Sequence, residues 1–174
     1  MSHTSRSTGL FLVKSLPPIE VLVVESNPAD ALRTMTAFRA AGLNNGVHCV
    51  REGEDALNYL RRQGPYKEAR IPDLIFLDLP EPRISALNAL KVIKSTPALM
   101  HIPVVVAADE VDAAFVQAVY SLHGSGFIRK PAELMQFLRC IESCYEYWVS
   151  VVTLDREPAP AGFKAAKAAA VSIM

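Results

Sequence analysis

Short, continuous runs of apolar residues recur along the middle of the chain. Three of them are flanked by proline, polar or acidic residues, and they cover 19–24, 73–79 and 102–108. A strand that is buried on both faces has this near-continuous apolar character, which is typical of parallel sheets. We therefore predict three central strands at these positions and two shorter strands at 46–50 and 125–128.

Segments with helical periodicity separate the predicted strands. From 110 to 123, apolar residues recur at intervals of three and four, and Gly124 is the expected stop. Pro131 marks the expected entrance of the last helix, and Asn27 and Ser85 are expected N-caps. The other stripes predicted to be buried are Ala31, Leu32, Met35 and Phe38; Leu57 and Leu60; Ala86, Ala89, Leu90 and Ile93; and Leu134, Phe137, Leu138, Ile141, Tyr145 and Trp148.

Strands and helices that alternate five times predict an α/β fold, with helices on both faces of a parallel sheet. In open sheets of this kind, ligands bind beyond the carboxyl ends of the strands, where the strand order reverses. The residues that follow the apolar runs are therefore the candidates for a functional site. They are Glu25, Ser26, Asp78, Ala108, Asp109, Lys130 and Pro131.

The two ends of the chain lack this repeating pattern. Residues 1–18 contain only one short apolar stretch, too short for a signal peptide or a membrane span, so we expect a flexible leader. Residues 149–174 consist of an apolar arm and then a tail rich in alanine and proline, a composition that buries little surface. The predicted domain covers residues 19–148.

Composition argues against several classes of protein. With 18 basic and 18 acidic side chains the net charge is zero, so no overall field favours nucleic acid or a membrane as partner. The three cysteines, Cys49, Cys140 and Cys144, have no C-x-x-C spacing, which argues against a zinc site and fits a reducing cytoplasm. The sequence has no G-x-G-x-x-G motif and no P-loop, which argues against a nucleotide-binding enzyme on the same fold.

Glu25 follows the first predicted strand, Asp78 ends the third, and Lys130 precedes a proline after the fifth. This pattern resembles the receiver domain of response regulators. The segments VVESNPAD, PDLIFLDLPEPRISAL, STPALMHIPVVV, GFIRKP and IESCYEYW are most similar to stand-alone regulators paired with cyanobacterial and bacterial phytochromes. The resemblance implies a three-layer, flavodoxin-like (CheY-like) fold with strand order 2-1-3-4-5. It also implies a cytoplasmic signalling protein, not an enzyme, with a sensor histidine kinase as partner.

The resemblance assigns roles to the residues at the strand ends. Asp78 is the expected acceptor of a phosphoryl group, and Lys130 is expected to contact the phosphoryl oxygens. A Mg²⁺ ion would neutralise phosphoryl charge during the transfer. Mg²⁺ prefers oxygen ligands, and the family pattern places them at Glu25, Asp78 and the backbone carbonyl of Pro80. Phe127 corresponds to the family's switch aromatic, although core packing explains it equally well.

Two positions depart from the family pattern. Ser26 replaces the second acid, and a carboxylate contributes on the order of 4 kcal/mol to an adjacent charge at an effective dielectric of 20. Ala108 replaces the switch hydroxyl and removes a hydrogen bond to a charged group, worth roughly 1.5 to 3 kcal/mol. We therefore expect weakened Mg²⁺-dependent phosphorylation. Two alternatives stay open: Glu81 supplies the missing carboxylate, or the chain is a pseudo-receiver that acts as a phosphorylation-independent adaptor.

Signal output is expected to pass through protein contacts. Residues 155–174 are too few for a helix-turn-helix module, so a transcription factor is not expected. The segment YEYWVSVVTL, which ends at Leu154, is too apolar to lie exposed on a tail. We predict a homodimer through the fourth helix, fifth strand and fifth helix, with this arm taking part. The alternative is that the arm folds back on its own domain.

Overall fold

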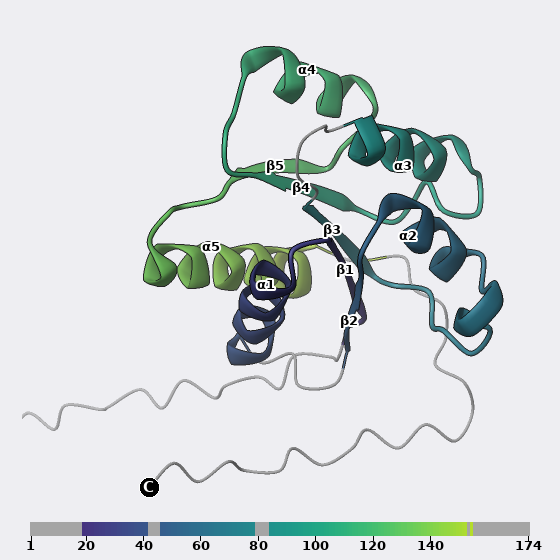
Figure 1. The fold of residues 1–174 in the computed structure, drawn as a ribbon, viewed down its shortest axis with the longest axis horizontal. Helices are drawn as coiled ribbons and strands as arrows, with labels where there is room; N and C mark the ends of the chain where they lie inside the picture. Colours follow the sequence, from purple (N-terminus) through teal and green to yellow (C-terminus); the bar gives the residue numbers. More distant parts are fainter. Residues whose placement is uncertain (1–18, 42–45, 79–83, 153, 155–174) are drawn as a thin grey trace, which may run out of the picture.

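The computed structural model describes residues 19–41, 46–78, 84–152 and 154. Five parallel strands form one sheet in the order β2-β1-β3-β4-β5 (Figure 1), which confirms the predicted topology. The strands are β1 (Val21–Glu25), β2 (Val47–Val50), β3 (Leu74–Asp78), β4 (Val104–Ala108) and β5 (Gly126–Arg129). The helices are α1 (Pro28–Ala40), α2 (Gly53–Leu60), α3 (Ile84–Ser95), α4 (Ala113–Ser121) and α5 (Leu134–Glu146), with short turns η1 (Gly64–Tyr66) and η2 (Tyr147–Val151).

The helices cover both faces of the sheet. Figure 1 shows α1 and α5 on one face and α2, α3 and α4 on the other, as the three-layer prediction required. The chain alternates strand and helix, and each crossover returns the chain to the same end of the sheet. The carboxyl ends of all five strands therefore lie along one edge, and the connections that follow them can form a site there.

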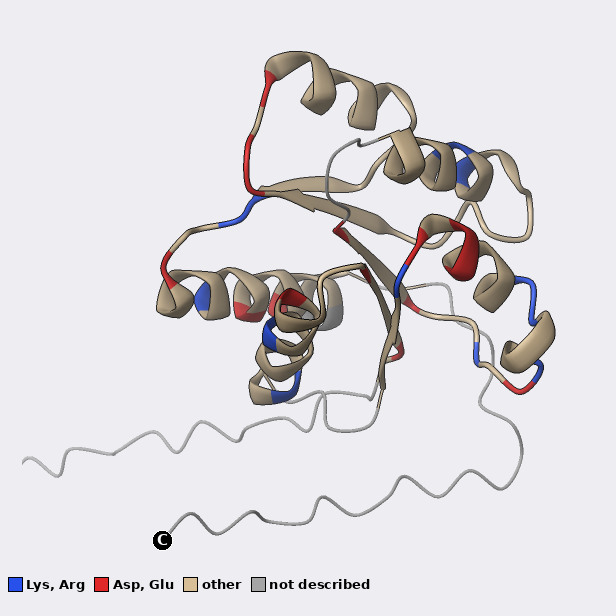
Figure 2. Cartoon of the chain, viewed as in Figure 1, with Lys and Arg blue, Asp and Glu red and all other residues tan. Residues whose placement is uncertain are grey.

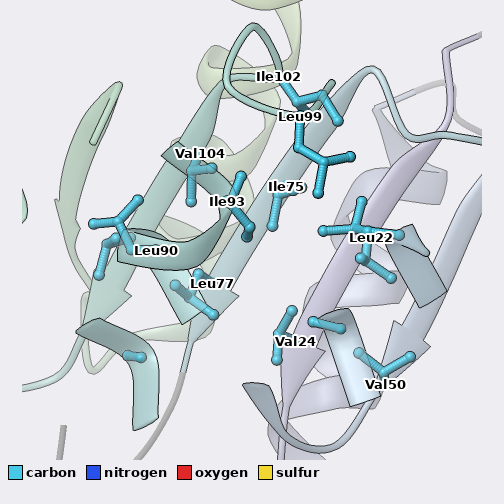
Figure 3. Close-up of a cluster of buried hydrophobic side chains, with 14 of the residues drawn as sticks. Leu22, Val24, Val50, Ile75, Leu77, Leu90, Ile93, Leu99, Ile102 and Val104 are labelled. Carbon is cyan, nitrogen blue, oxygen red and sulfur yellow. The ribbon is translucent and has the colours of Figure 1, made fainter. Parts of the chain in front are cut away.

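Two buried clusters hold the layers together. In β1, Leu22 and Val24 point into the cluster under α2, α3 and α4, whereas Val21 and Val23 point into the cluster under α1 and α5. Figure 3 shows the first cluster, in which strand residues such as Leu77 face Leu90 and Ile93 of α3. Every residue of β1, β3 and β4 is buried, because side chains alternate between two covered faces. This burial explains the continuous apolar runs.

Helix α1 begins as the sequence predicts but buries a different stripe. The Asn27 side chain accepts hydrogen bonds from the backbone N–H groups of Ala29 (2.9 Å) and Asp30 (3.3 Å), as an N-cap does. Leu32, predicted to be buried, is 63% exposed. The buried positions on this helix are Thr34, Ala37 and Phe38. The prediction missed Thr34 because a hydroxyl residue was not counted as a core residue.

The starts of three other helices differ from the prediction. Helix α3 begins at Ile84, so Ser85 lies inside its first turn instead of capping it. Helix α4 begins at Ala113, where the Asp112 carboxylate caps the Phe115 N–H at 2.7 Å, and Val111 lies outside the helix. Helix α5 begins at Leu134, after the N-cap Glu133, and not at Pro131. Its buried residues are Phe137, Ile141 and Tyr145, whereas Leu134 is exposed.

The end of α4 is determined by two residues. His123 takes the left-handed conformation, with φ of 62°, that was expected of Gly124. Gly124 is needed for a different reason: a Cβ atom there would lie 2.5 Å from Cγ1 of Val119. The glycine therefore permits a close approach to α4 instead of a strained backbone angle.

The cysteines are half-buried side chains. Burial raises the pKa of the Cys49 and Cys140 thiols, and raises the pKa of Cys144 to about 12. Thiolates are the reactive and metal-binding form of cysteine, so these side chains act as packing residues in this structure. Within the described ranges, no helix is both long and apolar enough to cross a membrane.

Candidate phosphoryl-acceptor site

The strand register brings the predicted site residues to one edge of the sheet. Glu25 at the end of β1 lies directly opposite Asp78 at the end of β3. Ala108, the last residue of β4, is paired with Arg129, and its carbonyl accepts the backbone N–H of Lys130 at 2.8 Å. Figure 2 shows the acidic ends of β1 and β3 and the acidic segment after β4 near the basic segment after β5.

Lys130 lies at the centre of a group of carboxylates. Its Nζ atom donates a hydrogen bond to Oδ2 of Asp78 at 2.8 Å and lies 3.3 Å from Oδ2 of Asp109. The same atom is 4.0 Å from Oε2 of Glu25 and 4.0 Å from Oδ2 of Asp30. The Lys130 side chain is only 9% exposed, so this ammonium group is held inside the site.

Glu25 and Asp78 form a buried pair of carboxyl groups. Glu25 accepts the backbone N–H of Asn27 at 2.7 Å and shares a side-chain hydrogen bond with Asp78. Burial, together with the bond to Asp78, raises the pKa of Glu25 to about 8. Burial also raises the pKa of Asp78, although its hydrogen bonds to Glu25 and Lys130 act in the opposite direction. Two carboxyl groups buried side by side therefore resist ionising together unless a positive charge lies close to them.

The charge of Lys130 is stabilised by its neighbours. Burial alone would lower the pKa of this ammonium group, but the hydrogen bond to Asp78 and the charges of Asp78, Asp109 and Glu25 raise it overall. The lysine is consequently charged at neutral pH, so it can attract an anionic group to the Asp78 carboxylate.

A small hollow beside Asp78 contains residues that the sequence analysis missed. Helix α1 contributes Asp30, Arg33 and Thr34 to its lining. The remaining lining residues are Asp78, Asp109, Lys130, Pro131 and Phe137. The spacing i, i+3 and i+4 after the N-cap Asn27 was the available signal, since it places all three side chains on one face of the helix.

A comparison with protein families identifies the family of this domain. The model of the response regulator receiver domain matches residues 21–142. This chain belongs to that family. It is therefore a signalling domain of two-component phosphorelay systems, and its sheet order is that of CheY-like receivers.

Known receivers with similar sequences include regulators named for phytochromes. Response regulator Rcp1 of Synechocystis sp. is 30% identical over 141 residues, which cover 81% of this chain and 96% of Rcp1. The phosphorylated cyanobacterial phytochrome response regulator RcpA is 36% identical, with a TM-score of 0.74 over 79% of this chain and 99% of RcpA. The Mn²⁺-bound form of Rcp1 has a TM-score of 0.72 at 30% identity, and covers 79% of this chain and 99% of its own.

Receivers bind Mg²⁺ or Mn²⁺, and the acidic pair of this receiver fits such an ion. Within the described ranges, no three His, Cys, Asp or Glu side chains converge closely enough to hold a metal ion directly. Mg²⁺ needs only one or two carboxylates, because it keeps several waters. Glu25 and Asp78 would provide them, whereas the half-buried Ser26 brings no charge. Pro80 and Glu81, the other two predicted ligands, lie outside the described residues.

The two positions expected to act as a switch lie on neighbouring strands. Ala108 is 5% exposed and has no hydroxyl to donate to a phosphoryl group. Phe127 is half-buried and packs edge-to-face against Phe115, with ring centroids 5.6 Å apart. Core packing therefore accounts for Phe127 in this conformation, and its role as a switch remains a prediction.

Proposed function

We propose that this receiver accepts a phosphoryl group on Asp78 from the phosphohistidine of a sensor histidine kinase. The observation that supports it most strongly is the 2.8 Å contact between Nζ of Lys130 and Oδ2 of Asp78, with Glu25 at the paired position on the neighbouring strand β1. Three chain segments that are far apart in sequence thus meet around one buried aspartate.

The transfer follows from this geometry. An Asp78 oxygen attacks the phosphorus atom, the P–N bond of phosphohistidine breaks, and an acyl phosphate forms while the imidazole leaves. Lys130, which already bonds to Asp78, then also pairs with a phosphoryl oxygen. When bound, a divalent cation held by Glu25 and Asp78 supplies positive charge to the phosphoryl oxygens. Burial keeps Asp78 away from competing contacts with bulk water.

The expected weakening belongs to the same proposal. Ser26 leaves the cation one carboxylate short of the family pattern, and Ala108 lacks the hydroxyl that would bond a phosphoryl oxygen. Both departures oppose the accumulation of phosphate charge at Asp78. We therefore expect slower phosphorylation than in receivers with two acids after β1. The alternative of a phosphorylation-independent adaptor is not favoured, since the acceptor and its lysine are paired.

Acetyl phosphate with Mg²⁺ tests the acceptor without a kinase. Intact mass spectrometry of the wild-type protein should show the addition of one phosphoryl group. Asp78→Asn should show none, and the matched exposed carboxylate variant Asp109→Asn should retain it. Phosphorylation of Asp78→Asn to the wild-type level, or none in the wild-type protein, would overturn the proposal.

A phytochrome-type histidine kinase is the proposed source of the phosphoryl group. The support is the similarity to RcpA and Rcp1, at 36% and 30% identity over nearly all of their length. Such a phosphorelay places the receiver in the cytoplasm. Phosphotransfer from a purified phytochrome kinase to the wild-type protein but not to Asp78→Asn is the expected result.

Restoring the missing hydroxyl should strengthen phosphorylation. In Ala108→Ser, the new hydroxyl can donate to a phosphoryl oxygen, a bond worth roughly 1.5 to 3 kcal/mol. We expect the phosphorylated fraction at limiting acetyl phosphate to rise on the order of tenfold. Quantitative mass spectrometry measures it, with Ala107→Ser as the control on the adjacent residue. An unchanged fraction in Ala108→Ser would show that the β4 hydroxyl position is not limiting here.

We also propose that the receiver forms a homodimer through α4, β5 and α5. Exposed apolar side chains on this face and in the following turn support it: Tyr120 is 52% exposed, Tyr147 52% and Val151 72%. Trp148 and Leu154, by contrast, pack against the core cluster under α1 and α5 of their own chain. The arm therefore folds back at these two residues, while Tyr147 and Val151 stay available for contact.

Light scattering after size-exclusion chromatography tests the role of the arm. The full-length protein should have the mass of a dimer, and a chain ending at Trp148 should shift toward the monomer mass because the exposed Val151 is lost. A Tyr120→Ser variant provides a comparison on α4 that leaves the arm intact. A dimer mass that survives the truncation would contradict a contribution from the arm.

A further inference from the structure

The pocket beside Asp78 contains a carboxylate that the sequence pattern does not account for. We propose that Asp30, on the first turn of α1, supplies a third carboxylate of the divalent-cation site beside Glu25 and Asp78, in place of the acid that Ser26 replaces. It does so by accepting hydrogen bonds from waters of the bound cation. This inference rests on the proposed function of Asp78.

Asp30 and Glu25 lie at the same distance from the ammonium group of Lys130. Oδ2 of Asp30 and Oε2 of Glu25 each lie 4.0 Å from Nζ of Lys130. The two carboxylates therefore approach the same ammonium group, which in turn bonds to Asp78 at 2.8 Å. A cation that enters beside Asp78 would be within reach of water bound to Asp30.

The position of Asp30 is fixed by its surroundings. Its backbone N–H donates to the Asn27 cap at 3.3 Å, and its Oδ1 atom accepts a hydrogen bond from Arg33 at 3.1 Å. The Arg33 guanidinium lies over the ring of Phe137, 5.2 Å from its centroid. Only Oδ2 is directed to the site, and the side chain is 29% exposed. A carboxylate held in this way can orient water with little loss of side-chain freedom.

A buried hydroxyl in the same pocket indicates a polar occupant. Thr34 is 1% exposed, and its Oγ1 atom has no hydrogen-bond partner among the residues that the structure describes. Thr34 lines the pocket together with Asp30 and Asp78. Buried hydroxyls are normally paired with protein or ordered water. Water belonging to a hydrated cation would satisfy both the Thr34 hydroxyl and the Asp30 carboxylate.

Asp109 is the matched comparison for Asp30. Its Oδ2 atom is even closer to Lys130, at 3.3 Å, but its side chain is 78% exposed. An exposed carboxylate is screened by solvent and free to turn away. If proximity to the lysine alone mattered, Asp109 would contribute more than Asp30. The proposal predicts the reverse.

Isothermal titration calorimetry of the full-length protein with Mn²⁺ or Mg²⁺ tests the inference. Asp30→Asn should weaken cation binding on the order of tenfold, the loss typical of groups that orient a metal's ligands. Asp109→Asn should change it by less than about twofold. Adding Ser26→Asp to Asp30→Asn should restore the affinity, because the family's acid returns. Cooperative thermal unfolding without added cation should show that Asp30→Asn is folded.

Two outcomes would overturn the role of Asp30. One is an Asp30→Asn dissociation constant equal to that of the wild-type protein, while Asp78→Asn still abolishes binding. In that case the cation site at Asp78 stands and the inference about Asp30 alone fails. The other is an equal loss in Asp109→Asn, which would show a general charge effect. Failure of the proposed function has a separate readout, because it depends on phosphoryl mass at Asp78 and not on cation affinity.

Discussion

Replacing Lys130 with alanine is expected to lower the free energy of unfolding by about 3 to 5 kcal/mol. The Nζ atom is the hydrogen-bond donor to Asp78 and lies within 4.0 Å of Glu25 and Asp30. Removal of one partner leaves buried carboxylates without the cation that offsets their desolvation. The effect should be large because the lysine side chain is only 9% exposed.

Urea denaturation of Lys130→Ala measures this loss. The exposed Lys91 on α3 provides a control, and Lys91→Ala should change stability by less than about 0.5 kcal/mol. Added Mg²⁺ should stabilise Lys130→Ala more than the wild-type protein, since a cation can replace part of the lost charge. If Lys130→Ala lost less than about 1 kcal/mol, the ion pair would be a weak surface contact and not the centre of the site.

Phe76→Ala is expected to destabilise the fold by about 3 to 5 kcal/mol. Phe76 is fully buried in β3 and packs edge-to-face against Phe38 of α1, with ring centroids 5.7 Å apart. It lies two residues before Asp78 and fixes the strand that carries this residue. Loss of the ring leaves a cavity between the sheet and α1 that rigid neighbours fill only in part.

Phe127→Ala is the matched control for this effect. Phe127 forms the same kind of ring contact with Phe115, at 5.6 Å, but it is half-buried on the edge strand β5. We expect a loss of about 1 to 2 kcal/mol, since less apolar area is buried. Thermal or urea unfolding measures both variants. Equal losses of stability in Phe76→Ala and Phe127→Ala would contradict this expectation, because the contact of Phe76 with α1 would then stabilise the fold no more than the contact on the edge strand.

The sheet could be predicted because burial on both faces has a direct sequence signature. Within β1, β3 and β4, the only polar side chains are Glu25 and Asp78, and both lie at the carboxyl end of a strand. The strand ends then follow from parallel topology, so the meeting of these residues with Lys130 was predictable from the order of the motifs. Their roles remain predictions of the family resemblance.

Helix boundaries and helix faces were less predictable. Apolar spacing predicted that α4 begins at residue 110. The helix begins at Ala113, because the Asp112 carboxylate accepts the Phe115 N–H and caps it there. Apolarity likewise suggested that Leu32 is buried, whereas α1 turns the hydroxyl residue Thr34 inward. That rotation depends on how α1 packs against α5, which sequence periodicity alone does not specify. For the same reason, sequence periodicity does not reveal that Asp30 faces the pocket.

The departures from the family affect two steps of signalling differently. Asp78 and Lys130 lie in contact at 2.8 Å, so the proposed acceptor keeps the lysine that the family pattern assigns to it. Ala108 lacks the hydroxyl that would connect that group to the β4 loop, so the conformational response is expected to be weaker than the capture of phosphate. Output that depends on protein contacts at α4, β5 and α5 would then respond only partly to phosphorylation.

A crystal structure of the protein with Mg²⁺ and beryllofluoride, a mimic of an acyl phosphate, tests the central claim most directly. We predict that beryllofluoride binds an oxygen of Asp78 and contacts Nζ of Lys130, with the cation bound between Asp78 and Glu25. Beryllofluoride at another residue, or Lys130 turned away from an occupied Asp78, would contradict the proposed site.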